Sequence, residues 1–310
     1  MRIISDYQFT DDQDRGATAA IGNFDGVHLG HLSVIDMARA AAPDAPLGIV
    51  TFEPHPRSYF APKSPPFRLM SSAARASRLA KVGVDRLYQL PFNTALAALT
   101  PFDFADKVLH QGLGLAHVVV GADFCFGQGR KGTADDLKTY GQRLGFGVTI
   151  APLMEQTEQT ISSTAIRRAL TDARPRDAAA MLGHWHRVEG PVIGGEQRGR
   201  ELGYPTANMS IDGLHPSAFG VYAVLADVLD GPHEGSYHGI ASMGVRPMFG
   251  ENKPNLETFI FDFKGDLYGA NVSIALVEHL RGEEKFDSLD ALITQMDADS
   301  AQARAILAAL

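Results

Sequence analysis

Hydrophobic and polar positions follow two different patterns along the chain, and the change falls near residue 184. In the first part, short apolar runs typical of buried strands alternate with stretches of helical periodicity. The predicted strands are Thr18–Ile21, Leu47–Phe52, Arg86–Gln89, His117–Gly121 and Gly147–Ile150, and helices are predicted to begin at His31, Ser71, Phe102, Ala134, Ser163 and Asp177. This alternation predicts a doubly wound α/β domain with a parallel sheet, which binds ligands in loops beyond the strand carboxyl ends.

From Trp185 onward the pattern changes to closely spaced strands separated by turns rich in Gly, Pro, Asn and Asp. The predicted strands are Arg187–Ile193, Gly220–Leu229, Tyr237–Met243, Leu256–Phe263 and Asn271–Leu280. Such spacing predicts an antiparallel β-barrel or sandwich. Apolar residues after Ser288 recur at helical spacing, so we expect terminal helices packed on the barrel. We therefore predict two domains, residues 1–183 and residues 184–310.

Composition and charge agree with this division. The chain has 310 residues and 45% hydrophobic content, against a usual domain size of roughly 100–200 residues. Residues 1–183 carry 19 basic and 18 acidic side chains, whereas residues 184–310 carry 9 and 18. The net charge of −8 argues against a general nucleic-acid binder, because phosphate backbones are held by surplus Lys and Arg.

Cysteine usage and hydropathy indicate the environment of the protein. Cys125 is the single cysteine, so no internal disulfide is possible and nothing requires an oxidising compartment. No segment approaches the roughly 18 uninterrupted apolar residues of a membrane span, and no export signal is visible. We expect a cytoplasmic protein without a membrane partner.

The strongest local motif lies between the first predicted strand and the following helix. Its residues of interest are Gly22, Asn23, Phe24, Asp25, Gly26, His28, Gly30 and His31. Glycines let a backbone approach a ligand closely, a helix N-terminus attracts anions, and two histidines three residues apart can donate hydrogen bonds to phosphate oxygens. The alternative is a glycine-rich turn with ordinary histidines. A zinc site is a weaker interpretation, because no third ligand lies nearby.

Several motifs carry a resemblance to known enzymes. The sequence His28-x-Gly30-His31 resembles the signature of the nucleotidyltransferase superfamily, which transfers AMP or CMP from a triphosphate. Further segments resemble the bacterial bifunctional riboflavin kinase/FMN adenylyltransferase (FAD synthetase) family, in that family's order. They are residues 51–56 (TFEPHP), 121–127 (GADFCFG), 161–167 (ISSTAIR), 199–208 (GRELGYPTAN), 220–222 (GVY), 256–263 (LETFIFDF) and 266–269 (DLYG).

In the first half, the resemblance implies a site for adenylyl transfer. Ser163, Thr164 and Arg167 would bind ATP phosphates opposite the glycine–histidine motif, and His28, His31 and Arg167 would be the catalytic groups. The resemblance implies flavin contacts from Phe52, His55, Asp123 and Phe124. The residues alone favour a plain helix N-cap at Ser162 to Thr164, followed by surface arginines.

In the second half, the resemblance implies a kinase site. Thr206 and Asn208 lie two residues apart, so on an extended chain their side chains point the same way. Their oxygens suit Mg²⁺ that nucleotide phosphates also bind, but the residues alone favour an ordinary turn, because Pro, Thr and Asn are common turn residues. The resemblance implies that both residues and Gly199 contact ATP, with Thr206 and Asn208 at the metal. Glu257 would activate the 5′-hydroxyl of riboflavin; its strand pattern alone favours an outward-facing glutamate on an edge strand.

Other features of the sequence do not carry chemistry or depart from the family. Residues 127–133 look like a phosphate loop, but the GK[ST] order is broken, so this is not a Walker A motif. Cys125 lies between two phenylalanines, which favours a packed hydrophobe over a nucleophile. Cys125, Ser242 and Met248 stand where the family has arginine, asparagine and threonine, which affects particular flavin-loop hydrogen bonds.

The expected function is therefore the two-step synthesis of FAD. The barrel would phosphorylate riboflavin to FMN with ATP and Mg²⁺, and the α/β domain would transfer AMP from a second ATP to FMN, releasing pyrophosphate. The expected partners are small molecules, with no nucleic acid. Two alternatives remain: a single-activity adenylyltransferase for another small phosphoester with a regulatory barrel, and a non-enzymatic nucleotide sensor.

Overall fold

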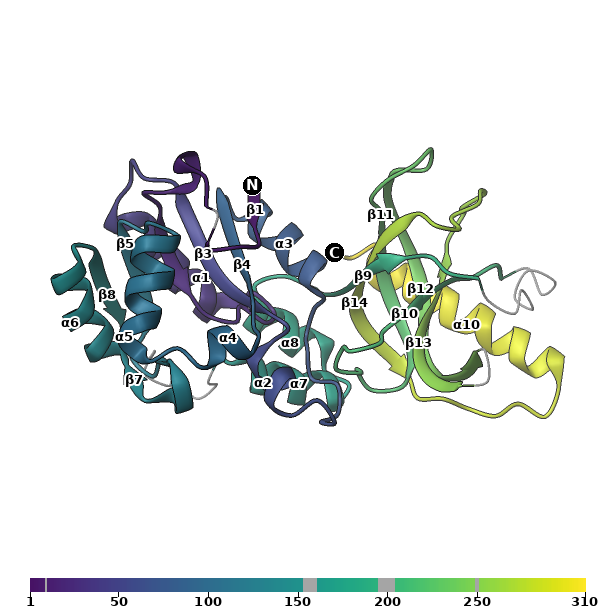
Figure 1. Ribbon diagram of the computed structural model, residues 1–310. Helices are drawn as coiled ribbons and strands as arrows, with labels where there is room; N and C mark the ends of the chain where they lie inside the picture. Colours follow the sequence, from purple (N-terminus) through teal and green to yellow (C-terminus); the bar gives the residue numbers. More distant parts are fainter. Residues whose placement is uncertain (9, 153–160, 195–203, 249–250) are drawn as a thin grey trace. The chain divides into compact units, whose positions relative to one another are not determined.

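The computed structural model describes residues 1–310 except 9, 153–160, 195–203 and 249–250 (Figure 1). Contacts divide the chain into two compact units. The first unit comprises residues 1–64 and 75–160, and the second comprises residues 65–74 and 161–310. Residues 161–183, which the sequence pattern assigned to the first domain, thus group with the second unit. A division of the two activities at residue 184 stays a prediction.

A parallel six-stranded sheet forms the centre of the first unit, in the order β1-β4-β3-β2-β5-β8. Its strands are β1 (Arg2–Ile4), β2 (Thr18–Ile21), β3 (Leu47–Glu53), β4 (Arg86–Pro91), β5 (His117–Gly121) and β8 (Gly147–Ala151). From β2 the chain adds strands in one direction as far as β4, and then in the other direction from β5. This order confirms the doubly wound prediction and puts the switch point, where such sheets bind ligands, between β2 and β5.

Helical segments connect these strands. They are η1 (Asp12–Asp14), α1 (Leu29–Ala41), α2 (Pro56–Phe60), α3 (Ser72–Lys81), α4 (Thr94–Ala97), α5 (Pro101–Asp103), η2 (Phe104–Gly112), η3 (Gln128–Arg130) and α6 (Ala134–Leu144). The helix predicted from Phe102 is a short α-helix followed by the π-helix η2. A small hairpin of β6 (Cys125–Phe126) and β7 (Gly132–Thr133) contains the rejected phosphate-loop sequence.

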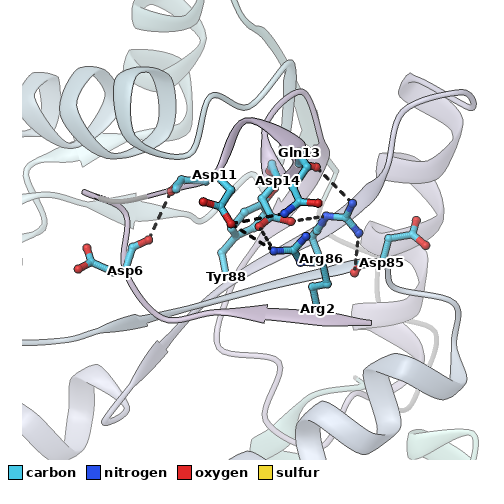
Figure 2. Close-up of polar contacts among 9 residues, drawn as sticks. Arg2, Asp6, Asp11, Gln13, Asp14, Asp85, Arg86 and Tyr88 are labelled. Atoms are coloured by element: carbon cyan, nitrogen blue, oxygen red, sulfur yellow. Dashed lines mark hydrogen bonds and ion pairs between the residues drawn. The ribbon is translucent and has the colours of Figure 1, made fainter.

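The strand β1 was not predicted, and a polar cluster anchors it (Figure 2). Asp14 is buried, and its carboxylate lies 3.0 Å from Nη2 of Arg2 and 2.9 Å from Nε of Arg86. The hydroxyl of Tyr88 donates to the backbone carbonyl of Asp14 at 2.5 Å. Because Arg2 and Arg86 are register partners in β1 and β4, this one carboxylate ties both strands to the segment before β2.

The second unit is built on six antiparallel strands in the order β10-β13-β12-β11-β14-β9. They are β9 (His186–Pro191), β10 (Ala207–Ser210), β11 (Gly220–Val228), β12 (Gly235–Met248), β13 (Glu251–Ile260) and β14 (Asn271–Arg281). A bridge between Ile193 and Asn208 links the two ends of the sheet, so the barrel is nearly closed. The predicted β-barrel is confirmed.

Helices complete the second unit. The tail predicted as helices is, in the described part of the chain, the single helix α10 (Leu289–Leu307), whose Ala303 and Leu307 pack on barrel residues that include Ala223 and Val277. Helices α7 (Ser163–Thr171) and α8 (Pro175–Leu182) form a separate apolar cluster with Leu69. None of the helices in the described residues is long and apolar enough to cross a membrane.

Candidate active sites

The glycine–histidine motif forms the loop from β2 into α1, beside the switch point of the sheet. Phe24 and Val27 have φ angles of +50° and +45°, a conformation that L-residues other than glycine adopt rarely, and β-branched residues most rarely. Both side chains are buried. Since such strained residues persist only where the surroundings hold them, the packing of this loop imposes one backbone path on it.

His28 and His31 bind each other reciprocally at the start of α1. Nδ1 of His28 accepts from the backbone N–H of His31, and Nδ1 of His31 accepts from the N–H of His28, both at 3.3 Å. The rings stack with centroids 3.6 Å apart. Because each Nδ1 is an acceptor, a neutral ring carries its proton on Nε2. In each neutral ring the proton is therefore on Nε2, at the N-terminal end of α1.

The charge state of His31 follows from its desolvation. Desolvation, and secondarily the charge of His28, lowers the pKa of His31 well below its ordinary value of 6.5. His31 is therefore neutral at physiological pH. A neutral N–H donor beside the positive end of the α1 dipole suits a phosphate oxygen. The reciprocal bonds form a capping box at the start of α1, and the role of the two histidines in phosphate binding stays a prediction.

The predicted flavin residues lie on two loops of the first unit. A series of aromatic rings joins Phe52, at the end of β3, to Phe124, in the loop after β5. Centroid distances are 6.4 Å from Phe52 to Phe104, 5.6 Å from Phe104 to Phe126 and 5.4 Å from Phe126 to Phe124. The structure thus connects two residues that are 72 positions apart in the sequence.

The other two predicted flavin residues differ in environment. His55 is buried and caps α2, with its Nδ1 accepting from the backbone N–H of Arg57 at 3.0 Å. Asp123 is exposed. Its backbone carbonyl lies 3.5 Å from the thiol of the neighbouring Cys125, which is half-buried.

Three aromatic residues near this site were not among the predicted ones. The ring centroid of Phe92 lies 5.7 Å from that of Phe52, 5.3 Å from that of Tyr59 and 5.7 Å from that of Phe60. Phe60 is 68% exposed, which is unusual for a large apolar side chain at the end of an aromatic group. In the sequence, the adjacent aromatic residues Tyr59 and Phe60, which follow Pro54-His55-Pro56, were the signal that could have revealed this aromatic group.

Ser163, Thr164 and Arg167 lie on α7, within the second unit. The predicted N-cap is confirmed, because the hydroxyl of Ser162 accepts from the backbone N–H of Ala165 at 3.1 Å. Nε of Arg167 donates to the backbone carbonyl of Phe67 at 2.5 Å, and the guanidinium lies 5.6 Å from the Phe67 ring. The role of these residues in phosphate binding stays a prediction.

Strand pairing brings the predicted kinase residues together. Glu257 on β13 is the register partner of Asn208 on β10 and of Ser242 on β12. Antiparallel register partners share one face of a sheet, so these three side chains form a row. The expectation of an edge glutamate is wrong, because β13 is paired on both sides. Glu257 is half-buried and its Oε1 accepts from Nδ2 of Asn255 at 3.2 Å.

Thr206 and Asn208 also contact each other, and Thr206 lies at the edge of a cavity. Nδ2 of Asn208 lies 3.3 Å from the carbonyl of Thr206 and 3.5 Å from its hydroxyl. Thr206 lines a cavity of about 340 Å³, together with Thr258 and the turn at residues 263–268. Gly199 lies outside the described residues, as does the side chain of Met248.

A contact from the C-terminal helix supports this segment. The hydroxyl of Tyr204 donates to the carboxylate of Asp297 on α10. The ring centroid of Tyr204 lies 4.7 Å from that of Phe259. Tyr204 directly precedes Pro205 and Thr206, so α10 helps to fix where the predicted ATP-binding segment begins. The periodicity of the tail predicts a helix on the barrel but contains no signal for this pairing.

Comparison with known proteins identifies the class of enzyme. The family of FAD synthetases matches residues 10–165, and the family of riboflavin kinases matches residues 182–307. Together, the two matches define a two-part enzyme that makes flavin nucleotides.

Full-length relatives give the family. The bifunctional riboflavin kinase/FMN adenylyltransferase of Pseudomonas fluorescens is 41% identical over 96% of this chain and 94% of its own length. The protein of the same name from Escherichia coli (strain K12) is 36% identical over 93% and 92%, and that from Bacillus subtilis is 32% identical over 98% and 96%. The chain belongs to the bifunctional riboflavin kinase/FMN adenylyltransferase family.

A solved structure supports the fold of the whole chain. A crystal structure named as a macrolide-efflux protein from Streptococcus pneumoniae has a TM-score of 0.82 and 32% identity, and the match covers 98% of each chain.

The activities follow from the family. The enzyme phosphorylates riboflavin to FMN and then transfers AMP from ATP to FMN, which gives FAD. A single-activity adenylyltransferase and a nucleotide sensor, the two alternatives from the sequence, are therefore not supported.

Proposed function

We propose that residues 1–183 and residues 184–310 each contain the site of one of the two reactions. Adenylyl transfer takes place at the loop from β2 into α1, and riboflavin phosphorylation takes place at the row of side chains on β10, β13 and β12. The observation that supports the first assignment is the reciprocal pairing of His28 and His31 at a helix N-terminus beside the switch point, which leaves each Nδ1 as an acceptor. The division of activities at residues 1–183 and 184–310 is part of the same proposal.

In adenylyl transfer, an oxygen of the FMN phosphate attacks the α-phosphorus of ATP, and pyrophosphate leaves. No covalent enzyme intermediate is needed, because a phosphate is a competent nucleophile once its charge is screened. Nε2–H of His28 and of His31 stabilise the charge that develops on the phosphates. The contribution of such donors to catalysis is large when the protein holds them in position before the reaction. The loop residues that bind phosphate are Gly22, Asn23, Phe24, Asp25, Gly26 and Gly30, and the α7 residues are Ser163, Thr164 and Arg167.

The flavin of FMN contacts the aromatic residues of the same unit. Phe52 and Phe124 offer ring faces and edges at the two ends of the aromatic series, and exposed Phe60 offers a further surface for a planar ring. His55 and Asp123 supply polar contacts from the same two loops. Support for this assignment is the adjacency of the β3 and β5 loops to the switch point.

In the kinase reaction, the carboxylate of Glu257 accepts the proton of the riboflavin 5′-hydroxyl, whose oxygen attacks the γ-phosphorus of ATP, and ADP leaves. A positioned base of this kind contributes roughly 10²–10⁴-fold to rate. Thr206, from the lining of the cavity, and Asn208 contact the ATP phosphates, and the resemblance implies the same contact for Gly199.

The residues present fit a magnesium ion that ATP brings with it. Thr206 and Asn208 contribute hard, neutral oxygens, and the described residues contain no group of three or more His, Cys, Asp or Glu that could hold a metal ion. Mg²⁺ commonly keeps few protein ligands and takes the rest from phosphates and water. Bound there, the ion would neutralise phosphate charge during transfer.

The same proposal covers the setting of the enzyme. The net charge of −8 and the single cysteine favour an enzyme that works in the cytoplasm on small molecules, without nucleic acid or membrane as a partner.

One experiment tests the assignment of the first site. The full-length protein and its His28→Ala variant are supplied with riboflavin, ATP and Mg²⁺, and FMN and FAD are separated by chromatography. We expect the variant to make FMN at the wild-type rate and FAD roughly 10²–10³ times more slowly, as for a lost charge-stabilising donor. Equal loss of both products in a normally melting protein would contradict the assignment.

A further inference from the structure

Arg75 is an arginine side chain of the first unit with 0% exposure, and it donates hydrogen bonds to acceptors at or just beyond the ends of three neighbouring strands. Its Nη1 donates to the backbone carbonyl of Asn23 at 3.2 Å. Its Nη2 donates to Oε2 of Glu53 at 3.1 Å and to Oε1 of Gln89 at 3.2 Å. These acceptors stand just after β2, at the end of β3 and near the end of β4, so one guanidinium spans the carboxyl edge of the sheet.

The contact to Asn23 reaches the loop that carries the histidine pair. The same carbonyl also accepts from the hydroxyl of buried Thr51 at 3.3 Å. It immediately precedes Phe24, the first of the two residues with positive φ. Two donors therefore hold the backbone at the point where the loop enters its strained conformation.

The contact to Glu53 reaches the second predicted element of the site. Glu53 is followed by Pro54 and His55, within the segment whose residues are proposed to contact flavin. Burying a charged pair contributes little net stability compared with apolar residues of the same volume. A fully buried arginine that joins the phosphate loop to the flavin segment is thus better explained by geometry than by stability.

We propose that Arg75 is a positioning residue for adenylyl transfer. It acts through the carbonyl of Asn23 to hold the loop before α1, and through Glu53 to hold the flavin segment at a fixed distance from it. This inference rests on the proposed assignment of the loop as the phosphate site. The planar fork of an arginine serves three acceptors at once, which the compact ammonium of a lysine does not reproduce.

The test compares Arg75→Lys with the wild type and with Arg78→Lys, the same substitution one turn later on α3. For each full-length protein we measure kcat and KM for FAD formation from FMN and ATP, kcat for FMN formation from riboflavin, and the melting temperature. We expect Arg75→Lys to lower kcat of FAD formation by roughly 10²-fold, because small displacements of reacting groups have effects of that size. FMN formation, and both activities of Arg78→Lys, are expected to match the wild type.

A double substitution separates positioning from charge neutralisation. Arg75→Met alone leaves the Glu53 carboxylate without this partner, whereas Arg75→Met with Glu53→Gln removes both charges. We expect the double variant to regain melting temperature relative to Arg75→Met and to remain slow in FAD formation. Recovery of turnover together with melting temperature would overturn the proposal, because it would reduce Arg75 to a counter-charge.

Thr51→Val provides a test that introduces no buried charge. It removes the second donor to the Asn23 carbonyl with little change of shape, and we expect a several-fold loss of FAD formation. If Thr51→Val and Arg75→Lys both keep kcat within twofold of the wild type, the proposal is overturned. His28→Ala, measured in parallel, separates the two proposals. Wild-type FAD formation by His28→Ala would reject the assignment of the phosphate site. Slow FAD formation by His28→Ala, together with wild-type rates in the Arg75 variants, would reject only the role of Arg75.

Discussion

The proposed phosphate loop of the first unit comes from ten consecutive residues, 22–31, whereas the proposed kinase site comes from three strands whose key residues lie at positions 208, 242 and 257. A loop that joins a parallel strand to a helix binds anions through local features, namely glycines, a helix N-terminus and neighbouring histidines. A barrel site depends on strand register, since a shift of one residue turns every side chain to the other face. Local sequence therefore reveals the first kind of site more readily than the second.

The largest expected effect in this comparison concerns the barrel site. Glu257→Gln preserves the shape of the row with Asn208 and Ser242 and removes the proposed base. We expect riboflavin phosphorylation to fall by roughly 10²–10⁴-fold, while FAD formation from added FMN continues at the wild-type rate. Steady-state assays with each substrate check this, with Glu234→Gln, an exposed residue between β11 and β12, as the control. Wild-type phosphorylation by Glu257→Gln would mean that this carboxylate is only structural.

A second prediction concerns the physical separation of the two sites. A fragment of residues 184–310 is expected to convert riboflavin to FMN and never to make FAD. A fragment of residues 161–310 is expected to do the same with higher stability, because it keeps α7 and α8. Helix α8 contacts β14 and β9, and Arg176 on α8 pairs with Glu278 on β14.

The difference between the two fragments is measurable by thermal unfolding. Burial of one large apolar side chain contributes about 1.5–3 kcal/mol, so we expect the longer fragment to melt roughly 5 °C higher or more. Equal melting temperatures would show that residues 161–183 contribute nothing to the barrel. A folded 161–310 fragment that binds neither riboflavin nor ATP would contradict the separation itself.

The smallest expected effect concerns pH and a buried histidine of the second unit. Burial, with smaller contributions from His184 and His215, lowers the pKa of His186 to about 3. The unfolded chain titrates this residue near its ordinary pKa of about 6.5. Between these values the unfolded state binds more protons, so stability falls as pH decreases, by at most about 1.4 kcal/mol per pH unit.

Variants isolate this contribution. His186→Gln is expected to flatten the dependence of unfolding free energy on pH between about 6.5 and 3, as measured by denaturant titration at several pH values. His238→Gln, which changes an exposed residue of β12, serves as the control and should leave the slope unchanged. An unaltered slope in His186→Gln would refute the assignment of the buried neutral histidine.

Most of the fold was predictable because its patterns are local. Alternating strand and helix periods indicate the parallel sheet, and closely spaced strands with turn residues indicate the barrel. Two strands of these sheets were not predicted. Arg2–Ile4 is three residues long and anchored by ion pairs, and Ala207–Ser210 follows turn residues that mask its alternation. Neither segment is long enough to show a recognisable strand alternation of apolar and polar residues.

The site was predictable only in part, for physical reasons. The histidine pair and the polar residues of each motif were visible, but their tautomers, their register and the pairing of Tyr204 with Asp297 depend on tertiary contacts. Arg75 carried no signal at all, because an arginine on an amphipathic helix is normally a surface residue. The grouping of residues 161–183 with the barrel likewise follows from packing, which periodicity does not contain.

The ion pairs of Asp14 bear on the exposed edge of the parallel sheet. Strand β1 lies at one end of the sheet order, and an exposed sheet edge invites pairing with another chain unless it is short or charged. Here the outermost strand is three residues long, and the guanidinium of Arg2 ties it to a buried carboxylate. Loss of that carboxylate would uncover the longer β4 as the new edge, so the first visible consequence of an Asp14→Ala change is expected to be aggregation on storage rather than a loss of activity.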